Sequence, residues 1–324
     1  MLLNLTLEDH RGVQGRNNKL VSKEEDMEIN EKLKILNKPP MKSIKMKLGD
    51  MYDCINIYKQ PAFDHPLLRN HKIQMKPNVI QGEQIEESTS NMVSSDVRYK
   101  LKGCPSETVP IRRTTKEELV NAKHLSNWIK RRHVHPQLFG DNKTRVFGLW
   151  TADGFKETGC YNMLCPGFVQ VHPEYSFGEE LTVGRYGGNQ RVFDFSVHRD
   201  PESGNWWFIN GIDNAKIGYW PKEIFTHLSK HASVIGYGGV AGAGLSEPTP
   251  PMGYGYSPTI NSTYTCFMAG MKVVDDRGRY LNFDTSKVQL DHDTERRCYD
   301  IIFPGWYISH GIMMFFGGPG GYCP

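Results

Sequence analysis

The glycines of this chain are concentrated in its C-terminal half. Of the 32 glycines in the 324 residues, only 7 precede Thr151 and the other 25 follow it. A glycine accepts the backbone conformations of tight turns and bulges because it has no Cβ. Frequent glycines and aromatic residues, with little helical periodicity, are typical of short antiparallel strands. The C-terminal half is therefore predicted to be all-β.

Hydrophobic alternation supports a β-sandwich in this half. Phe193, Phe195 and Val197 would lie on one face of a strand, and a turn leads to a second strand at residues 206–210. We expect the two strands to pair. A single short helix is predicted over residues 222–230. Further short strands, separated by glycine and proline, are expected to complete an antiparallel β-sandwich.

The N-terminal half has a different character. Residues 1–42 form a charged lead that is expected to be helical or disordered, while residues 53–58 alternate like a short strand. Residues 59–66 are predicted to be an extended loop. A helix is predicted over residues 116–129, since Thr115 and Glu118 have the spacing of a capping box.

The cysteines and sequons favour an extracellular protein. The seven cysteines have no zinc-site spacing, so six are available for three disulfides whose pairing the sequence leaves open. Sequons for N-glycosylation begin at Asn4, Asn142 and Asn261. Against this, the first residues lack the apolar stretch of a secretory signal. Seven reduced cysteines in a cytosolic protein are the alternative interpretation.

Several functional classes have little support. A net charge of +3 and the lack of a long apolar run predict neither a nucleic-acid partner nor a membrane. His227 and His231 have zincin spacing, but Leu228 stands where the Glu base is needed. No Gly-x-Ser-x-Gly elbow occurs, and residues 236–242 lack the Lys of a phosphate loop. We expect no metal and no cofactor.

A dense series of motifs carries a family resemblance. It includes Trp150-Thr151-Ala152-Asp153-Gly154, Thr158-Gly159-Cys160-Tyr161-Asn162, Cys165-Pro166-Gly167-Phe168, Gly204-Asn205-Trp206-Trp207, Ile217-Gly218-Tyr219-Trp220-Pro221, Pro251-Met252-Gly253 and Gly317-Gly318-Pro319-Gly320-Gly321. Together these make residues 133–324 resemble the catalytic domain of the plant neprosin family. Residues 43–130, through the segments 53–66 and 103–115, resemble that family's activation peptide.

The resemblance implies a fold, a location and a disulfide pattern. The family is secreted and has a curved antiparallel β-sandwich, here expected to lack some strands and to follow a small α+β activation domain. The implied disulfides are Cys54–Cys104, Cys160–Cys165 and Cys298–Cys323, which leaves Cys266 unpaired. The family's activity is that of a glutamic peptidase that cleaves after proline.

Both glutamates of that peptidase are missing from this sequence. The reaction needs one ionised and one protonated carboxyl group facing the same water. One family glutamate follows an aromatic-Gly-Gly turn, and here Val240 follows Tyr237, Gly238 and Gly239. The other falls in a segment that is absent before His133. A retained groove would be lined by this turn and by Trp150.

The sequence therefore predicts an inactive neprosin-like protein, with three alternatives left open. A proline-rich polypeptide or a cell-wall component is the expected partner. One alternative is an active acid post-proline endopeptidase, encoded by a longer transcript that restores the residues between Ile129 and His133. The others are a non-enzymatic extracellular binding protein and a remnant that does not fold stably.

Overall fold

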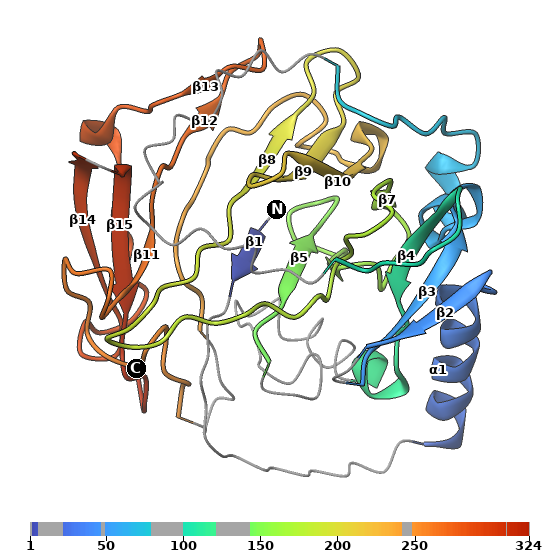
Figure 1. Cartoon of the computed structure of the whole chain (residues 1–324), viewed down its shortest axis with the longest axis horizontal. Helices are drawn as coiled ribbons and strands as arrows, with labels where there is room; N and C mark the ends of the chain where they lie inside the picture. Colours follow the sequence, from blue (N-terminus) through green and yellow to red (C-terminus); the bar gives the residue numbers. More distant parts are fainter. Residues whose placement is uncertain are drawn as a thin grey trace.

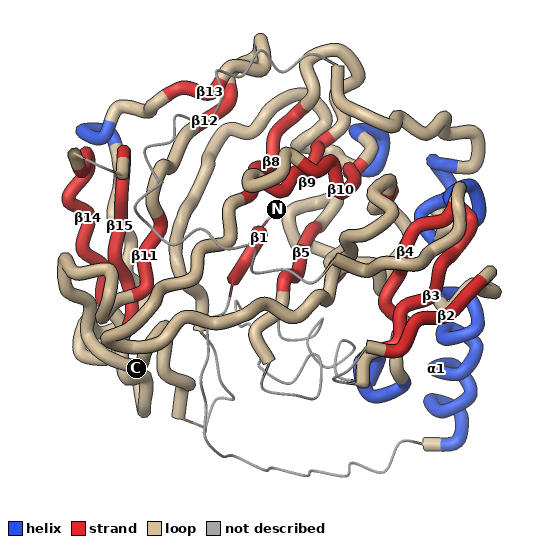
Figure 2. Tube along the Cα trace, viewed as in Figure 1, coloured by secondary structure: helices blue, strands red, loops and turns tan. Residues whose placement is uncertain are grey.

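Short antiparallel strands joined by long loops make up most of the regular secondary structure, as Figures 1 and 2 show. The computed structural model describes residues 2–5, 22–46, 49–78, 100–120, 143–241, 248–308 and 310–323. The first elements are β1 (Leu2–Leu5), α1 (Lys23–Leu36), β2 (Lys42–Lys45), β3 (Met51–Asn56), three 3₁₀ turns η1 (Ile57–Lys59), η2 (Pro61–Asp64) and η3 (Pro66–Leu68), and β4 (Thr108–Arg112). Strands β2, β3 and β4 form one antiparallel sheet beside α1.

Four further sheets contain the rest of the described strands. The elements are β5 (Val146–Trp150), β6 (Cys160–Tyr161), β7 (Val169–Gln170), β8 (Phe195–Arg199), β9 (Trp206–Asn210), β10 (Ala215–Trp220), η6 (Lys222–Ile224), β11 (Cys266–Met268), β12 (Val273–Val274), β13 (Tyr280–Leu281), η7 (Thr285–Lys287), β14 (Asp300–Tyr307) and β15 (Gly311–Gly317). The strand orders are β1-β5-β6, β7-β10-β9-β8, β11-β15-β14 and β12-β13. This confirms the predicted mostly antiparallel, sandwich-like class.

The strand pair predicted from residues 193–210 is present. Strand β8 pairs antiparallel with β9, with Val197 opposite Phe208 and His198 opposite Trp207. The side chains of Phe193, Phe195 and Val197 are partly buried against the main core, as the alternation predicts.

The helix predicted over residues 222–230 is wrong. The structure has only the 3₁₀ turn Lys222–Ile224, and Phe225 returns to an extended conformation. The apolar spacing of Ile224, Phe225 and Leu228 comes instead from side chains that pack on the main core. Thr226 then donates from its amide and its hydroxyl to the Ala152 carbonyl, which replaces a helical hydrogen bond with one to a distant loop.

The extended loop predicted over residues 59–66 is also wrong, because the segment forms 3₁₀ turns. Asn56 Oδ1 accepts from the Tyr58 amide at 3.0 Å and so caps η1. Pro61 and Pro66 each open a turn, where a missing amide hydrogen leaves no bond unmade.

Two helical predictions in the N-terminal half are borne out within the described residues. The charged lead is helical over Lys23–Leu36, with Ser22 accepting from the Glu25 amide. At its start the prediction is wrong, because Leu2–Leu5 forms strand β1, which pairs with β5. The capping box forms as predicted: Thr115 Oγ1 accepts from the Glu118 amide, and Glu118 accepts from the Thr115 amide at 2.7 Å. Residues 116–120 are helical, and the remainder of that predicted helix lies outside the described residues.

One hydrophobic core joins the two halves of the chain. Five buried residues of the N-terminal half, Ile55, Ile57, Leu68, Val109 and Ile111, contact a cluster from the C-terminal half that includes Val146, Trp150, Phe168, Phe177, Phe208 and Trp220. Figure 1 shows β3 and β4 beside the segment that carries β7. Neither half therefore buries its own apolar face alone.

A second face of the sheet that contains β10 is covered by residues 61–78. Ala62, Phe63 and Ile73 pack on Trp207 and Tyr219 in a smaller core cluster. Buried polar groups connect the same surfaces. The Gln60 side chain forms hydrogen bonds with the Gln170 backbone, and the Gln74 backbone amide donates to Tyr219 Oη. The Gln74 side chain and the Asn78 backbone amide donate to the Asp200 carboxylate. These hydrogen bonds fix the register of the covering segment.

Three disulfides tie the chain. Cys54 is joined to Cys104, Cys160 to Cys165 and Cys298 to Cys323, the pairs that the family resemblance implies. Cys266 is buried with a free thiol, and burial raises its pKa to about 11. Within the described residues, no helix is both long and apolar enough to cross a membrane.

His198 is a buried histidine on β8. Its side chain is 2% exposed, its ring lies edge-on to Tyr280, and Nδ1 is 3.4 Å from Ser196 Oγ. Nε2 has no hydrogen-bond partner among the described residues. Burial lowers the pKa of His198 to about 4; the Asp200 charge raises it slightly and Lys216 lowers it. The folded protein thus holds this imidazole neutral down to acid pH.

We expect this histidine to make folding less stable in acid. Below about pH 6.5 the unfolded chain binds a proton that the folded chain takes up only near pH 4, so stability falls as the pH decreases through that window. The full effect is on the order of 3 kcal/mol. Between the two ends of this pH window, the free energy of unfolding measured with urea should fall less for His198→Phe than for the original chain. His227→Phe, at an exposed histidine, should keep the original dependence; identical pH slopes for all three proteins would contradict the account.

Candidate active site

The turn of Tyr237, Gly238, Gly239 and Val240 lies against the C-terminal sheet. Tyr237 Oη donates to the Lys272 carbonyl at 2.6 Å, and its ring stacks on Phe283. A Cβ on Gly239 would collide with the Met252 thioether and press on the ring of Phe316. Glycine at this position thus allows the turn to approach β15 closely.

Val240 is the residue at which the family resemblance leads us to expect a carboxylic acid. Its side chain is partly exposed. An isopropyl group neither titrates nor forms hydrogen bonds, so it can neither hold a water nor protonate a leaving nitrogen. If this segment corresponds to the family's catalytic turn, its expected reactive position carries no acid.

Trp150 does not line a groove open to solvent. Only 5% of it is exposed, and its indole packs edge-on to Phe225 and directly over Gly167 in the main core. Trp207 and Trp220 are also buried, whereas Trp306 on β14 is exposed. Of the expected groove residues, the four turn residues lie at the surface of the C-terminal sheet and Trp150 belongs to the core.

The adjacent carboxylates Glu179 and Glu180 point to different surroundings. Glu179 is buried and accepts from the Ser176 amide, while Glu180 lies 3.4 Å from the Lys143 ammonium group. Neighbouring residues of an extended segment face opposite sides, as the sequence indicated. The two carboxylates therefore do not face a common water.

Among the residues that the structure describes, Asp194 is the carboxylic acid whose pKa lies above its ordinary value. Burial raises it, partly offset by a hydrogen bond from the Phe195 amide. The residue directly precedes β8, and its carboxyl group packs over Gly211. Its raised pKa favours the protonated form that a general acid requires, although that form is also common for any half-buried carboxyl group.

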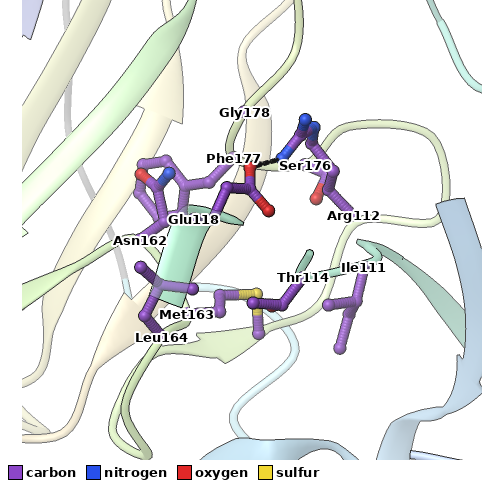
Figure 3. Close-up of a pocket in the computed structure, with 10 residues that line it drawn as sticks. All are labelled: Ile111, Arg112, Thr114, Glu118, Asn162, Met163, Leu164, Ser176, Phe177 and Gly178. Atoms are coloured by element: carbon purple, nitrogen blue, oxygen red, sulfur yellow. Dashed lines mark hydrogen bonds and ion pairs between the residues drawn. The ribbon is translucent and has the colours of Figure 1, made fainter. Parts of the chain in front are cut away.

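A small hollow of about 30 Å³ lies where the two halves of the chain meet (Figure 3). Residues from both halves line it: Ile111, Arg112, Thr114, Glu118, Asn162, Met163, Leu164, Ser176, Phe177 and Gly178. The Arg112 guanidinium reaches the Glu118 carboxylate across one side of the hollow, as the dashed line in Figure 3 marks. Both charges are thereby paired within the wall.

The two histidines with zincin spacing are not held together by a helix. His227 and His231 are exposed and follow the end of η6 at Ile224. Among the described residues, no group of three or more His, Cys, Asp or Glu side chains is placed to hold a metal ion.

Two family models match the chain. The model described as Neprosin matches residues 122–319, more than half of the chain, and the model described as Neprosin activation peptide matches residues 43–151. The chain belongs to the neprosin family. The two neprosin matches overlap over residues 122–151, which include strand β5.

A charged network joins the neprosin activation peptide to the domain that follows. Arg145, only 1% exposed, donates to both oxygens of Asp50 at 2.8 and 3.2 Å and to the Gly178 carbonyl. Arg112 donates to Asp50 Oδ1 at 3.0 Å. Burial raises the pKa of Asp50, but the hydrogen bonds and charges of Arg145 and Arg112 outweigh it and lower that pKa. Sequence reasoning missed this network, because three charged residues far apart in the sequence carry no local pattern.

Proposed function

We propose that this neprosin-domain protein is secreted and has no peptidase activity. The observation that carries the proposal is Val240 at the position where the family resemblance expects a catalytic glutamate. The secreted location is supported by the family match and by three disulfides, which persist in oxidising compartments.

The missing chemistry is the paired carboxyl function. A glutamic peptidase uses one carboxylate to take a proton from water and one carboxylic acid to protonate the leaving nitrogen. A general acid and a general base each contribute about 10²- to 10⁴-fold. With Val240 in the turn, one of these contributions is removed. The other family glutamate falls in a segment that this sequence lacks before His133, so the second contribution is missing as well.

The remaining carboxylates offer a weak substitute. Glu179 and Glu180 face different surroundings, and Asp194 has the raised pKa of an acid but packs over a glycine. One carboxyl group does not serve both roles in one step, since a base must be ionised while the acid is protonated. In the alternative function, acid post-proline endopeptidase activity, Asp194 is the described carboxylic acid whose raised pKa suits a general acid.

A neprosin domain without peptidase activity is left with binding as its role. The ligand class that we propose is a proline-rich polypeptide or another cell-wall component, following the substrate preference that the resemblance implies. A pulldown with immobilised proline-rich peptide should retain the folded protein. Retention equal to that of a scrambled peptide would remove this ligand from the proposal.

Activity assays with matched variants test the absence of catalysis. The full chain would be incubated with proline-containing peptides at acid pH and the products identified by mass spectrometry. We expect no specific cleavage from the original chain or from Asp194→Asn. Val240→Glu should also be inactive, because one added carboxyl group supplies only half of the pair. Cleavage that Asp194→Asn abolishes would instead establish the alternative function.

A further inference from the structure

Four tyrosines form a cluster on the surface. The ring of Tyr186 lies 5.5 Å from that of Tyr254, 4.9 Å from that of Tyr256 and 5.2 Å from that of Tyr264, measured between ring centroids. The exposed fractions are 47% for Tyr186, 59% for Tyr256 and 43% for Tyr264. A gathering of exposed aromatic side chains is typical of a surface that contacts a ligand or another group.

Hydrogen bonds hold the cluster in place. Tyr254 Oη donates to Gln190 Oε1 at 2.6 Å, and Gln190 Nε2 donates to the carbonyls of Arg185, Gly188 and Thr263. The Gly187 amide donates to the same Thr263 carbonyl at 3.0 Å. The loop that carries Tyr186 is therefore fastened to the loop that carries Tyr264.

The second of these loops contains a sequon. Asn261, Ser262 and Thr263 precede Tyr264 directly, and the Asn261 side chain is exposed. Asn261 Oδ1 accepts from the Thr263 amide at 3.0 Å, and the Tyr264 amide donates to the Asn261 carbonyl at 3.0 Å. This turn uses the oxygen of the amide group and leaves Nδ2, the atom that a sugar joins, at the surface beside the cluster.

We propose that Asn261 carries an N-linked glycan whose first sugars pack on the tyrosine cluster. The donor is an oligosaccharide linked to a lipid pyrophosphate. The bond between the sugar carbon and the pyrophosphate oxygen breaks, a bond to Asn261 Nδ2 forms, and Nδ2 loses one proton while the lipid pyrophosphate leaves. No oxidant or reductant is needed.

The chemistry of the cluster suits a sugar. A pyranose ring has an apolar face of C–H groups that covers an aromatic ring, and its hydroxyl groups meet the exposed phenol oxygens. The attachment point lies three residues from Tyr264 in sequence, so the first sugars are already at the surface that they cover. The inference rests on passage through the secretory pathway, which is part of the proposed function, and not on the lack of peptidase activity.

Mass spectrometry tests the attachment. The full chain would be secreted from a eukaryotic host behind a heterologous leader and analysed before and after enzymatic removal of N-glycans. We expect a glycan on Asn261 that is lost in Asn261→Gln and in Thr263→Ala, and kept in Ser262→Ala, which preserves the sequon. Because the leader forces secretion, a bare Asn261 would overturn this inference without touching the proposed location of the native protein.

Thermal unfolding tests the packing. In the glycosylated protein, Tyr186→Ala should lower Tm by roughly 3 °C more than it does in the Asn261→Gln background, a coupling that attachment alone would not produce. Tyr186→Phe keeps the ring and should retain most of the coupling. Equal shifts in both backgrounds would overturn the packing of the glycan on the cluster.

Discussion

A chain reduced to residues 143–324 is expected not to fold cooperatively on its own. Five buried residues of the activation-peptide region belong to the same core as Trp150, Phe168 and Trp220, so the truncation would bare one side of that core. It would also remove the segment 61–78 that covers Tyr219. Urea unfolding followed by near-ultraviolet circular dichroism should show no cooperative transition. The stabilisation lost with these buried contacts is expected to exceed the free energy of unfolding of a typical domain, ~5–15 kcal/mol.

The matched control supplies most of the removed N-terminal region as a separate polypeptide. Secretion of residues 22–120 together with residues 143–324 should restore a cooperative transition, because the two surfaces complement each other through the Gln60 and Gln74 hydrogen bonds. Cooperative unfolding of the isolated C-terminal segment would contradict the shared core.

Asp50→Asn is expected to destabilise the protein by about 3–5 kcal/mol, because it removes the negative charge from a buried network. Arg145 would keep its charge, 1% exposed, opposite a neutral amide. The free energy of unfolding from urea titrations at neutral pH measures the effect. Glu31→Gln is the control, since it breaks an exposed pair with Lys34 and should change stability by less than about 0.5 kcal/mol.

The same network makes a prediction about acid. The lowered pKa of Asp50 means that its contribution is present above the unfolded pKa of 3.8 and is lost as the pH falls below that value. Asp50→Asn should therefore lose less stability than the original chain on going to strongly acid pH.

The outcome at neutral pH decides the role of this network. If Asp50→Asn is as stable as the original chain there, Asp50 does not hold the two regions together.

Local patterns predicted the local structure well. The pairing of β8 with β9 followed from apolar alternation around one turn, and the capping box at Thr115 followed from a spacing of three residues. Both depend on residues close in sequence, where the hydrogen bonds or the faces of a strand are set locally. The helix after Pro221 failed because its apolar residues serve the tertiary core, and Thr226 bonds to a remote carbonyl.

The site was only partly predictable from the sequence. The segment with Val240 was assigned to the site because the residues around it keep the order of motifs in the family resemblance. Its contacts with Met252 and Phe316 depend on chain segments that meet only in the fold. The assignment of Trp150 to a groove shows the same limit, because a buried and an exposed tryptophan look alike in sequence.

The rate of peptide cleavage by the purified full chain at acid pH tests the central claim most directly. If Val240 stands at the position of a family glutamate, as we propose, the products of cleavage after proline should not exceed those in a sample without protein, even after long incubation. Specific cleavage after proline, saturable in peptide and proportional to the amount of protein, would contradict the claim that this neprosin-domain protein has lost its peptidase activity.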